Sequence, residues 1–230
     1  TTTGADNTYI GYQAGDDTRD DSKQNTVVGS LAFAGTHITA DADDCVAIGY
    51  SALGGVLQHA DVAGTVAIGS SALSALTTGA QNTVIGYQAA DGLTTGAYNT
   101  VLGYDALGNA TTQADHHVAI GRGAMSGAIV AEDLNFCVAV GDLAMSGALD
   151  AAASGSVALG KSALAALTSG AGNIAVGFQS GDAIDTQSGC TLIGYNTGTT
   201  INHDDAVGTT AVGWSACENI TSGQQNTAVG

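Results

Sequence analysis

Gln81–Ala90 reads Q-N-T-V-I-G-Y-Q-A-A and contains the pattern on which the whole chain is built. A β-branched run leads to Gly86, and Ala89 follows three residues later. The pattern recurs at thirteen motif glycines spaced 17 to 20 residues apart: Gly11, Gly29, Gly49, Gly69, Gly86, Gly103, Gly121, Gly141, Gly160, Gly177, Gly194, Gly213 and Gly230. A period of about 20 residues is typical of solenoids. We therefore predict an all-β solenoid of about thirteen rungs forming a single domain over residues 1–230.

Composition supports a thin repeated layer rather than an ordinary globule. Among 230 residues there are 34 glycines and no proline, with 44% hydrophobic, 5% aromatic and 11% charged residues. A core of small and β-branched residues has no bulky aromatic centre. Glycine does not occur at every third position and proline is absent, which excludes collagen.

The formal net charge of −17 restricts the partners, since Arg19, Lys23, Arg122 and Lys161 are the only lysines and arginines. Such a field repels phosphate backbones and anionic membrane surfaces, so we expect no nucleic-acid partner and no membrane insertion of this segment. No apolar run of 18 residues and no signal peptide is visible. Because the chain opens in a repeat turn and stops at a motif glycine, we expect a segment of a longer fibre.

Positions counted from the motif glycine predict the local structure. Position −1 is always Ile, Val or Leu, position −3 is Val, Ile or Thr, and position +3 is Ala in ten of twelve copies. Positions −3 and −1 share one face of a strand, and these β-branched runs are too short for helices. The invariant glycine indicates positive φ or a close backbone approach, hence a corner. A second short strand is expected from position +3, as at Ala106-Leu107.

Short repeats close with a glycine followed by asparagine, as in Thr78–Asn82, Thr95–Asn99 and Ser169–Asn173. This is turn chemistry, because asparagine can bond the nearby backbone. Where position −3 is Thr, position −2 is usually large, and where it is Val or Ile, position −2 is Ala. Both strand faces therefore look space-limited: one would line the interior and the other a subunit contact.

The longer copies grow between the second predicted strand and the next motif. Such insertions map to loops on one side of a solenoid, often the side that meets partners. The segments are Thr36–Asp44, Leu57–Ala63, Thr111–His116, Ala131–Phe136 and Asn202–Val207.

The motif resembles known fibre repeats. Val66-Ala67-Ile68-Gly69 and Asn173–Gly177 are similar to the head repeats of YadA-like trimeric autotransporter adhesins, and Asn82–Ala89 resembles repeats of phage-type tail fibre proteins. The resemblance covers essentially the whole chain. It implies a left-handed parallel β-roll, an intertwined or side-by-side homotrimer, and a rod that binds a cell surface. The period exceeds that of the adhesin head repeat, and no stalk heptads, neck or membrane anchor are present, which favours a fibre segment.

The four cysteines show no C-x-x-C pair. Cys45, Cys137 and Cys190 stand at position −4, where other copies carry Asn, Thr, Ser or His. We interpret them as small half-buried structural residues rather than a disulfide framework or a zinc site. Sequence leaves open that an oligomer brings such thiols together.

Histidines and acids cluster in the longer repeats. The groups are His37 before Asp41, His59 by Asp61, Asp115-His116-His117, and His203-Asp204-Asp205. A metal site is one interpretation, since imidazole and carboxylate are ordinary ligands, but no two groups share ligand spacing. The acidic runs Asp16, Asp17, Asp20, Asp21 and Asp41, Asp43, Asp44 lack a calcium-loop pattern. Solvated polar loops are favoured for both, with no metal ligand assigned.

Aromatic residues directly follow seven motif glycines: Tyr12, Tyr50, Tyr87, Tyr104, Phe178, Tyr195 and Trp214. In rungs about 4.8 Å apart, Tyr87 with Tyr104, and Phe178 with Tyr195 and Trp214, are expected to form ladders. Ladder packing at a corner or subunit seam is favoured over a sugar-binding platform.

No catalytic pattern is present: neither a nucleophile signature nor a phosphate-binding glycine loop occurs. We predict no enzyme, no catalytic residue and no cofactor. Short strands with an alanine-rich interior bury little per chain, so an obligate homotrimer is expected. The predicted function is attachment by an extracellular fibre, such as a virion tail fibre, to a host glycan or protein. The alternatives are a bacterial trimeric adhesin head and an ice-binding solenoid, for which the recurring Thr8, Thr26, Thr83 and Thr100 would form ladders.

Overall fold

The computed structural model describes residues 5–16, 22–35, 42–56, 62–110, 114–129, 134–203 and 206–230. Within these ranges one three-residue strand precedes each motif glycine. These strands are β1 Thr8–Ile10, β2 Thr26–Val28, β3 Val46–Ile48, β4 Val66–Ile68, β5 Thr83–Ile85, β6 Thr100–Leu102, β8 Val118–Ile120, β10 Val138–Val140, β11 Val157–Leu159, β12 Ile174–Val176, β13 Thr191–Ile193, β14 Thr210–Val212 and β15 Thr227–Val229. The two-residue strands β7 (Ala114–Asp115) and β9 (Leu134–Asn135) and the 3-10 helix η1 (Ala151–Ala153) complete the elements.

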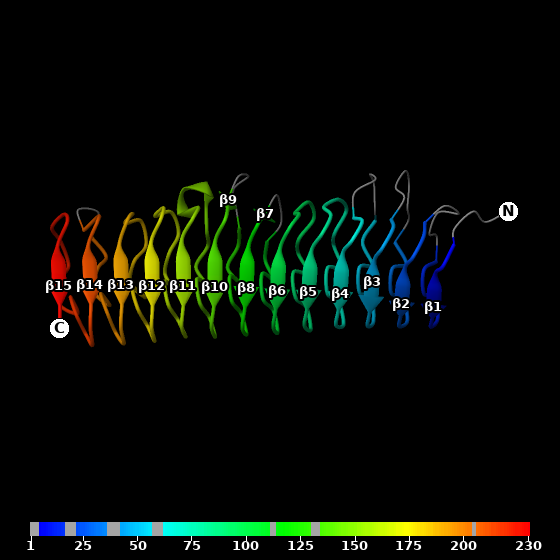
Figure 1. Ribbon diagram of the computed structural model, residues 1–230, viewed down its shortest axis with the longest axis horizontal. Coiled ribbons are helices and arrows are strands. Elements are labelled where there is room, and N and C mark those ends of the chain that lie inside the picture. Colours follow the sequence, from blue (N-terminus) through cyan, green and yellow to red (C-terminus); the bar gives the residue numbers. More distant parts are fainter. Residues whose placement is uncertain are drawn as a thin grey trace. The chain divides into compact units, whose positions relative to one another are not determined.

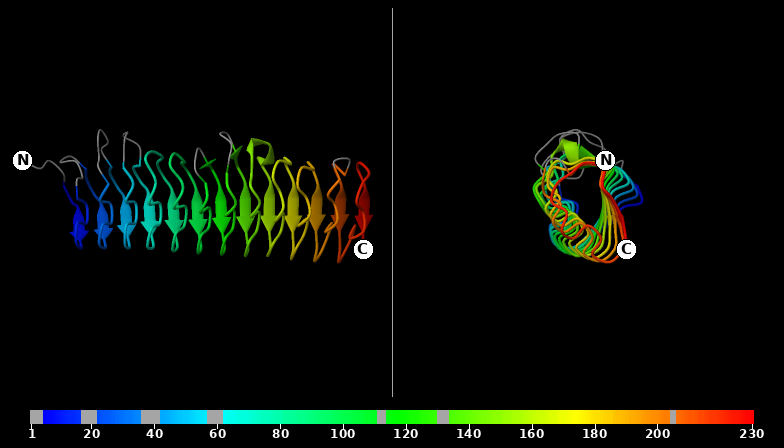
Figure 2. Two further views of the ribbon diagram at one scale, coloured as in Figure 1. Left: turned by 180° about the vertical axis from the view of Figure 1, so that it is seen from behind. Right: turned by 90° about the vertical axis from the view of Figure 1, so that its left-hand side faces the viewer.

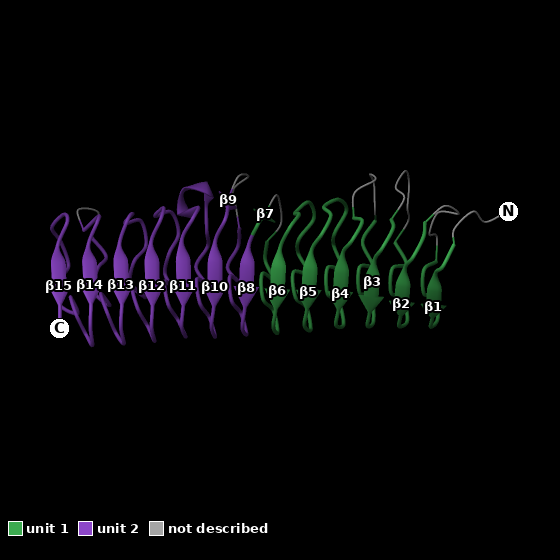
Figure 3. Ribbon diagram, in the orientation of Figure 1, with its two compact units in different colours: residues 1–116 green, residues 117–230 purple. Residues whose placement is uncertain are grey.

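The chain divides into two compact units, Thr1–His116 and His117–Gly230, shown in two colours in Figure 3. In unit 1, strands β1 to β6 pair side by side in chain order (Figure 1). In unit 2, strands β8 and β10 to β15 do the same. All pairs are parallel and join equal repeat positions, as Thr83↔Thr100 and Ile85↔Leu102 do. The predicted parallel β-solenoid is therefore confirmed.

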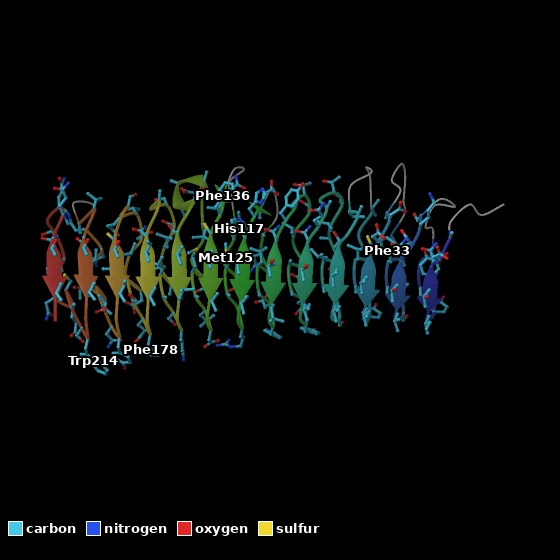
Figure 4. All side chains as sticks on the ribbon, in the orientation of Figure 1. Phe33, His117, Met125, Phe136, Phe178 and Trp214 are labelled. Atoms are coloured by element: carbon cyan, nitrogen blue, oxygen red, sulfur yellow. The ribbon has the colours of Figure 1, made fainter. Side chains whose placement is uncertain are left out.

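Each strand has one face toward the core and one toward solvent. Position −2, such as Val84 or Ala158, is buried in the motif strands from β2 to β14, whereas positions −3 and −1 are half-buried or exposed. The expectation that one face lines the interior is thus confirmed for position −2. Position +3, position +4 and a Leu or Ile seven or eight residues after the glycine fill the rest of the core. The side chains of Phe33 and Met125 lie there (Figure 4).

The motif glycine meets both requirements predicted for it. Gly86 has φ +148°, a value that side chains rarely adopt. A Cβ on Gly86 would also overlap the carbonyl oxygen of Gly103 in the next rung. The strand therefore ends at a corner where consecutive rungs touch through backbone alone, and the corners follow one another closely within each unit (Figure 2).

The prediction of a second strand from position +3 is wrong. Positions +1 to +4 form a turn in which +2 and +4 have left-handed φ, as at Gln88 (52°) and Ala90 (48°). This conformation costs roughly 1–2 kcal/mol per residue, and hydrogen bonds to both neighbours offset it. Gln88 N donates to Ser70 O of the preceding rung at 3.0 Å, and Ala90 N donates to Ala106 O of the following rung at 2.9 Å.

The predicted glycine–asparagine turn is confirmed. Asn82 Nδ2 donates to Gly79 O at 3.1 Å, and Asn173 Nδ2 donates to Gly170 O at 2.9 Å. Thr78 and Thr95 form a parallel bridge just before the turn. The asparagine side chain thus closes its own turn three residues back, which explains why the residue pair recurs.

Candidate functional surfaces

Positions −3 and −1 of each rung form a surface that we call the outer face. It carries Val, Ile, Leu or Thr in every described strand, 12 side chains in unit 1 and 14 in unit 2. Several large members are strongly exposed, among them Leu102 at 46% and Ile193 at 40%. Exposed apolar side chains that recur on rung after rung make this surface a candidate for an interaction.

Position −4, just before each strand, forms a polar column that points inward. Its side chains connect one rung to the next by accepting from a main-chain N–H and donating to a main-chain carbonyl. Asn25 Oδ1 accepts from Cys45 N at 2.9 Å, and Asn25 Nδ2 donates to Ala42 O at 2.7 Å. Because buried main-chain groups need partners, the column stabilises the stacking of the rungs.

The three cysteines of the polar column replace the asparagine as donors. The Sγ of Cys45 lies 3.2 Å from Val62 O, that of Cys137 3.4 Å from Ala153 O, and that of Cys190 3.5 Å from Ala206 O. Burial raises the pKa of the Cys45 thiol to about 11, so the thiol keeps its proton at neutral pH. All four cysteines are free and buried. The structural interpretation is therefore supported, although the side chains of Cys45, Cys137 and Cys190 are fully rather than half-buried.

His117 belongs to the same column. Its Nδ1 accepts from Cys137 N at 3.3 Å and its Nε2 lies 3.1 Å from Leu134 O. The hydrogen bond at Nδ1 assigns the ring proton to Nε2, which donates to the carbonyl. The histidine thus performs the two roles of the asparagine in other copies, which accounts for its burial.

The other histidine and acidic candidates that the structure describes do not converge on one site. The ring of His116 stacks on Tyr98 with centroids 4.8 Å apart, and Asp115 Oδ1 accepts from Ala97 N at 2.7 Å. Asp43 Oδ1 accepts from Lys23 N at 2.7 Å. Within the described ranges no three His, Cys, Asp or Glu side chains form a group that could hold a metal ion. His37, Asp41, His59, Asp61, Asp17, Asp20, Asp21, Asp204 and Asp205 lie outside the described residues.

Position +1, immediately after the glycine, forms a column at the corner that we call the corner column. Tyr87 and Tyr104 stack with centroids 5.7 Å apart in unit 1. In unit 2 Phe178, Tyr195 and Trp214 form a continuous stack, with centroid distances of 5.0 and 4.2 Å. The predicted ladders are confirmed. Phe178 and Trp214 project from the ribbon at the same edge (Figure 4).

The corner column of unit 2 also carries charge, which sequence reasoning missed. Arg122 pairs with Asp142 at 2.7 Å, and Lys161 Nζ lies 3.8 Å from the other oxygen of the same carboxylate. The three residues follow Gly121, Gly141 and Gly160. Aligning the chain on its motif glycines would have revealed them, since they occupy the aromatic position of other copies.

The carboxyl groups of two acids at position +5 have raised pKa values. Burial, and then the nearby charge of Asp105, raise the pKa of Asp91. Burial raises the pKa of Asp182 in the equivalent place of unit 2, where Asn196 replaces Asp105. Asp182 Oδ1 and Asn196 Oδ1 have no hydrogen-bond partner. Both acids are only partly buried, and we assign no ligand to this place.

The geometry defines a parallel β-solenoid whose constant parts are its polar column, glycine corner and outer face. No protein-family model, curated protein or solved structure matches the chain. Among the described residues there is no helix long and apolar enough to cross a membrane.

Proposed function

We propose that this chain is a structural and attachment segment of an extracellular trimeric fibre, a virion tail fibre or a similar appendage, which presents its outer loops to a host or cell surface. The outer face carries the proposal. It offers 12 side chains in unit 1 and 14 in unit 2, and a stable protein interface uses about 20–30 residues a side. Copies of the same chain are the proposed occupants, because identical rungs match each other in length and spacing.

Charge supports a self-association through this face. The net charge of −17 makes close approach of two chains unfavourable elsewhere on the surface. The side chains of the outer face are uncharged in every described strand. Apolar contact can therefore form there without desolvating an ion. The number three comes from the resemblance to trimeric adhesin and tail fibre repeats.

Attachment rather than catalysis is proposed because the repeated rung is a scaffold. Its buried polar groups, including His117 and three cysteines, are used in hydrogen bonds that stack the rungs. The loops between rungs vary in length, whereas the rung does not. Three copies would present each surface three times, and such multivalency compensates for weak single contacts.

The oligomeric state tests the proposal through a matched pair of variants in one rung. Leu102, at 46% exposure, is on the outer face, and Tyr104, at 54%, is on the corner column two residues later. Leu102→Glu places three carboxylates in the subunit contact and is expected to convert trimer to monomer. Tyr104→Glu is the control and is expected to remain trimeric. Sedimentation equilibrium giving a monomeric mass for the unaltered chain would overturn the proposal.

A bacterial trimeric adhesin head is the alternative with the same assembly. It would share the trimer and differ in the segments that accompany it, so the sedimentation result does not separate the two. The sequence of the full-length gene does. A coiled-coil stalk and an outer-membrane anchor following these repeats would favour the adhesin.

Ice binding is the other alternative, in which the threonines of the outer face would contact ice instead of another subunit. Thr191, Thr210 and Thr227 stand in register at position −3. Val46 and Val66 interrupt the same position in unit 1. A flat Thr ladder is needed for ice, so the interruption weighs against it. Thermal hysteresis measured on the purified protein would favour ice binding over the fibre.

A further inference from the structure

We infer that the corner column of unit 2 is a binding site for a carboxylated saccharide, such as a uronic or sialic acid chain. The inference rests on the proposed attachment function and names the chemistry of the ligand. The site consists of Arg122, Asp142, Lys161, Phe178, Tyr195 and Trp214. All six lie in unit 2 and directly follow consecutive motif glycines.

Main-chain hydrogen bonds fix the order of the site. Leu143 N donates to Arg122 O, Ser162 N to Asp142 O and Gln179 N to Lys161 O, each at 2.9 Å. Asn196 N donates to Phe178 O and Ser215 N to Tyr195 O, also at 2.9 Å. The charged and aromatic parts therefore form one line on consecutive rungs, with a rise of about 4.8 Å per rung.

The charged part of the line has a surplus of one positive charge. Arg122 and Lys161 share the single carboxylate of Asp142, and both cations remain more than half exposed. These are two of only four lysines and arginines in the chain. The Debye length at physiological salt is about 8 Å. Distant carboxylates are screened over that range, so an anion at this line responds mainly to the local surplus.

The aromatic part presents ring edges rather than ring faces. The planes of Phe178 and Tyr195 are 10° apart, and those of Tyr195 and Trp214 are 12° apart. Rings stacked along the line turn their edges to solvent, and the edge is the positive side of an aromatic quadrupole. Tyr and Trp also carry a hydroxyl and an indole N–H. The line is thus rich in donors and positive edges, which suits a ligand of hydroxyl and carboxylate oxygens.

A saccharide fits this line better than a compact anion does. The cations lie at one end and the donors at the other, over six rungs, so a short anion cannot contact both parts. An extended chain can. The corner column of unit 1 has tyrosine and serine in place of the charges, which makes it a natural comparison.

Trp214 is the only tryptophan of the chain, so its fluorescence reports directly on this line. The probes are hexagalacturonate and its fully methyl-esterified form, which keeps the sugar backbone and replaces each carboxylate with an uncharged methyl ester. We expect hexagalacturonate to change the Trp214 emission saturably and the ester to leave it unchanged. The response to hexagalacturonate should be lost in about 1 M NaCl, where the Debye length is about 3 Å.

Two variants should change the affinity in opposite directions, which a general loss of folding cannot do. Lys161→Gln removes the surplus cation and is expected to weaken hexagalacturonate binding about tenfold. Asp142→Asn frees both cations and is expected to strengthen it several-fold. Lys23→Gln, which removes an exposed cation in unit 1, is the charge-matched control and should change nothing.

Three outcomes would overturn the inference. Equal binding of the acid and the ester would remove the role of charge, and equal affinity of Lys161→Gln and Lys23→Gln would remove the role of this line. A drop in sedimenting mass for Lys161→Gln, with no saccharide response in the unaltered protein, would make the line a subunit contact.

A trimer that binds cells but not hexagalacturonate would leave the fibre proposal standing without this site. A monomer that binds hexagalacturonate would leave the site standing without the trimer.

Discussion

Asn82 and Asn99 occupy the same place in consecutive rungs, and Asn82 Oδ1 accepts from both Asn99 N and Asn99 Nδ2 at 3.0 Å. Asn82 Nδ2 in turn donates to Gly96 O at 2.7 Å. One buried amide thus accepts a hydrogen bond from a main-chain N–H of the next rung and donates one to a main-chain carbonyl of that rung. The rung-to-rung order of the solenoid depends on such side chains as much as on the strand ladder.

Asn82→Ala should lower the free energy of unfolding by about 2–3 kcal/mol. The change leaves Asn99 N and Gly96 O without their side-chain partner, and a buried polar group without a partner costs roughly 1–3 kcal/mol. Urea denaturation followed by circular dichroism measures the loss. Gln81→Ala, at the neighbouring exposed position outside the outer face, is the control and should stay within about 0.5 kcal/mol. Equal effects of the two variants would contradict the role of the amide.

Gly177→Ala should prevent stable folding of its rung. Gly177 has φ +135°, and a Cβ there would overlap the carbonyl oxygen of Gly194 in the next rung. Neither backbone can move without breaking the ladder between β12 and β13. We expect a loss above about 4 kcal/mol, in the range of exceptional single substitutions.

Gly172→Ala, five residues earlier in the same rung, is the comparison variant. It tests a glycine that has left-handed φ but no neighbouring backbone near its Cβ position. Gly172 has φ +62°, and no other atom lies within 4 Å of the place of its Cβ. The expected loss is only about 1 kcal/mol from the left-handed conformation. Thermal unfolding of the two variants side by side makes the comparison. A similar loss for both would contradict an added cost from the larger φ and the close approach at Gly177.

Features carried by one residue type at a constant place could be predicted from sequence. The strand before Gly86, its corner and the stack of Phe178 on Tyr195 are of this kind. A glycine needed at every corner leaves an unbroken signal, because no other residue tolerates both its φ and its neighbour. Aromatic residues at equal repeat positions must meet once the rungs stack in register.

Features whose repeat position is occupied by different residue types in different rungs could not be predicted. Positive φ at Gln88, Leu53 and Asp105 leaves no glycine in the sequence, because hydrogen bonds to adjacent rungs impose the conformation. The residue types of the polar column were visible at position −4, but their role was not, since Asn, Cys, His, Ser and Thr share no feature beyond small or moderate size and the capacity to form hydrogen bonds. The ion pairs of Asp142 follow from the register of rungs rather than from a local motif.

Cys45 should make stability depend on pH above about 9. Burial raises the pKa of its thiol to about 11 from a usual 9.0. Below pH 9 the thiol is protonated in both states and the stabilisation is fully present. Between pH 9 and 11 the unfolded thiol ionises while the folded thiol does not, so the free energy of unfolding falls by about 2 kcal/mol over this window.

Cys45→Ser isolates that contribution. A serine occurs naturally in the polar column at Ser156, whose Oγ donates to Gly170 O at 3.1 Å. The variant therefore keeps a donor and loses the titration. Urea denaturation at pH 8 and pH 10.5 should show a smaller decline for the variant than for the unaltered protein. Parallel declines would mean that the tyrosines, which both proteins share, account for the pH dependence.

Tyr195→Ala should lower stability by about 1–3 kcal/mol and shift the Trp214 emission to longer wavelength. Tyr195 stacks on both Phe178 and Trp214, and each aromatic pair contributes about 0.5–1.5 kcal/mol beyond the area it buries. Trp214 is already 70% exposed, so removing the middle ring uncovers only the face of the indole on which Tyr195 stacks. Tyr50→Ala is the control, because Tyr50 stands in the corner column of unit 1 between Ser30 and Ser70. Equal losses for both tyrosines, measured by urea denaturation, would show that the ring contributes through burial at its own rung and not through the stack.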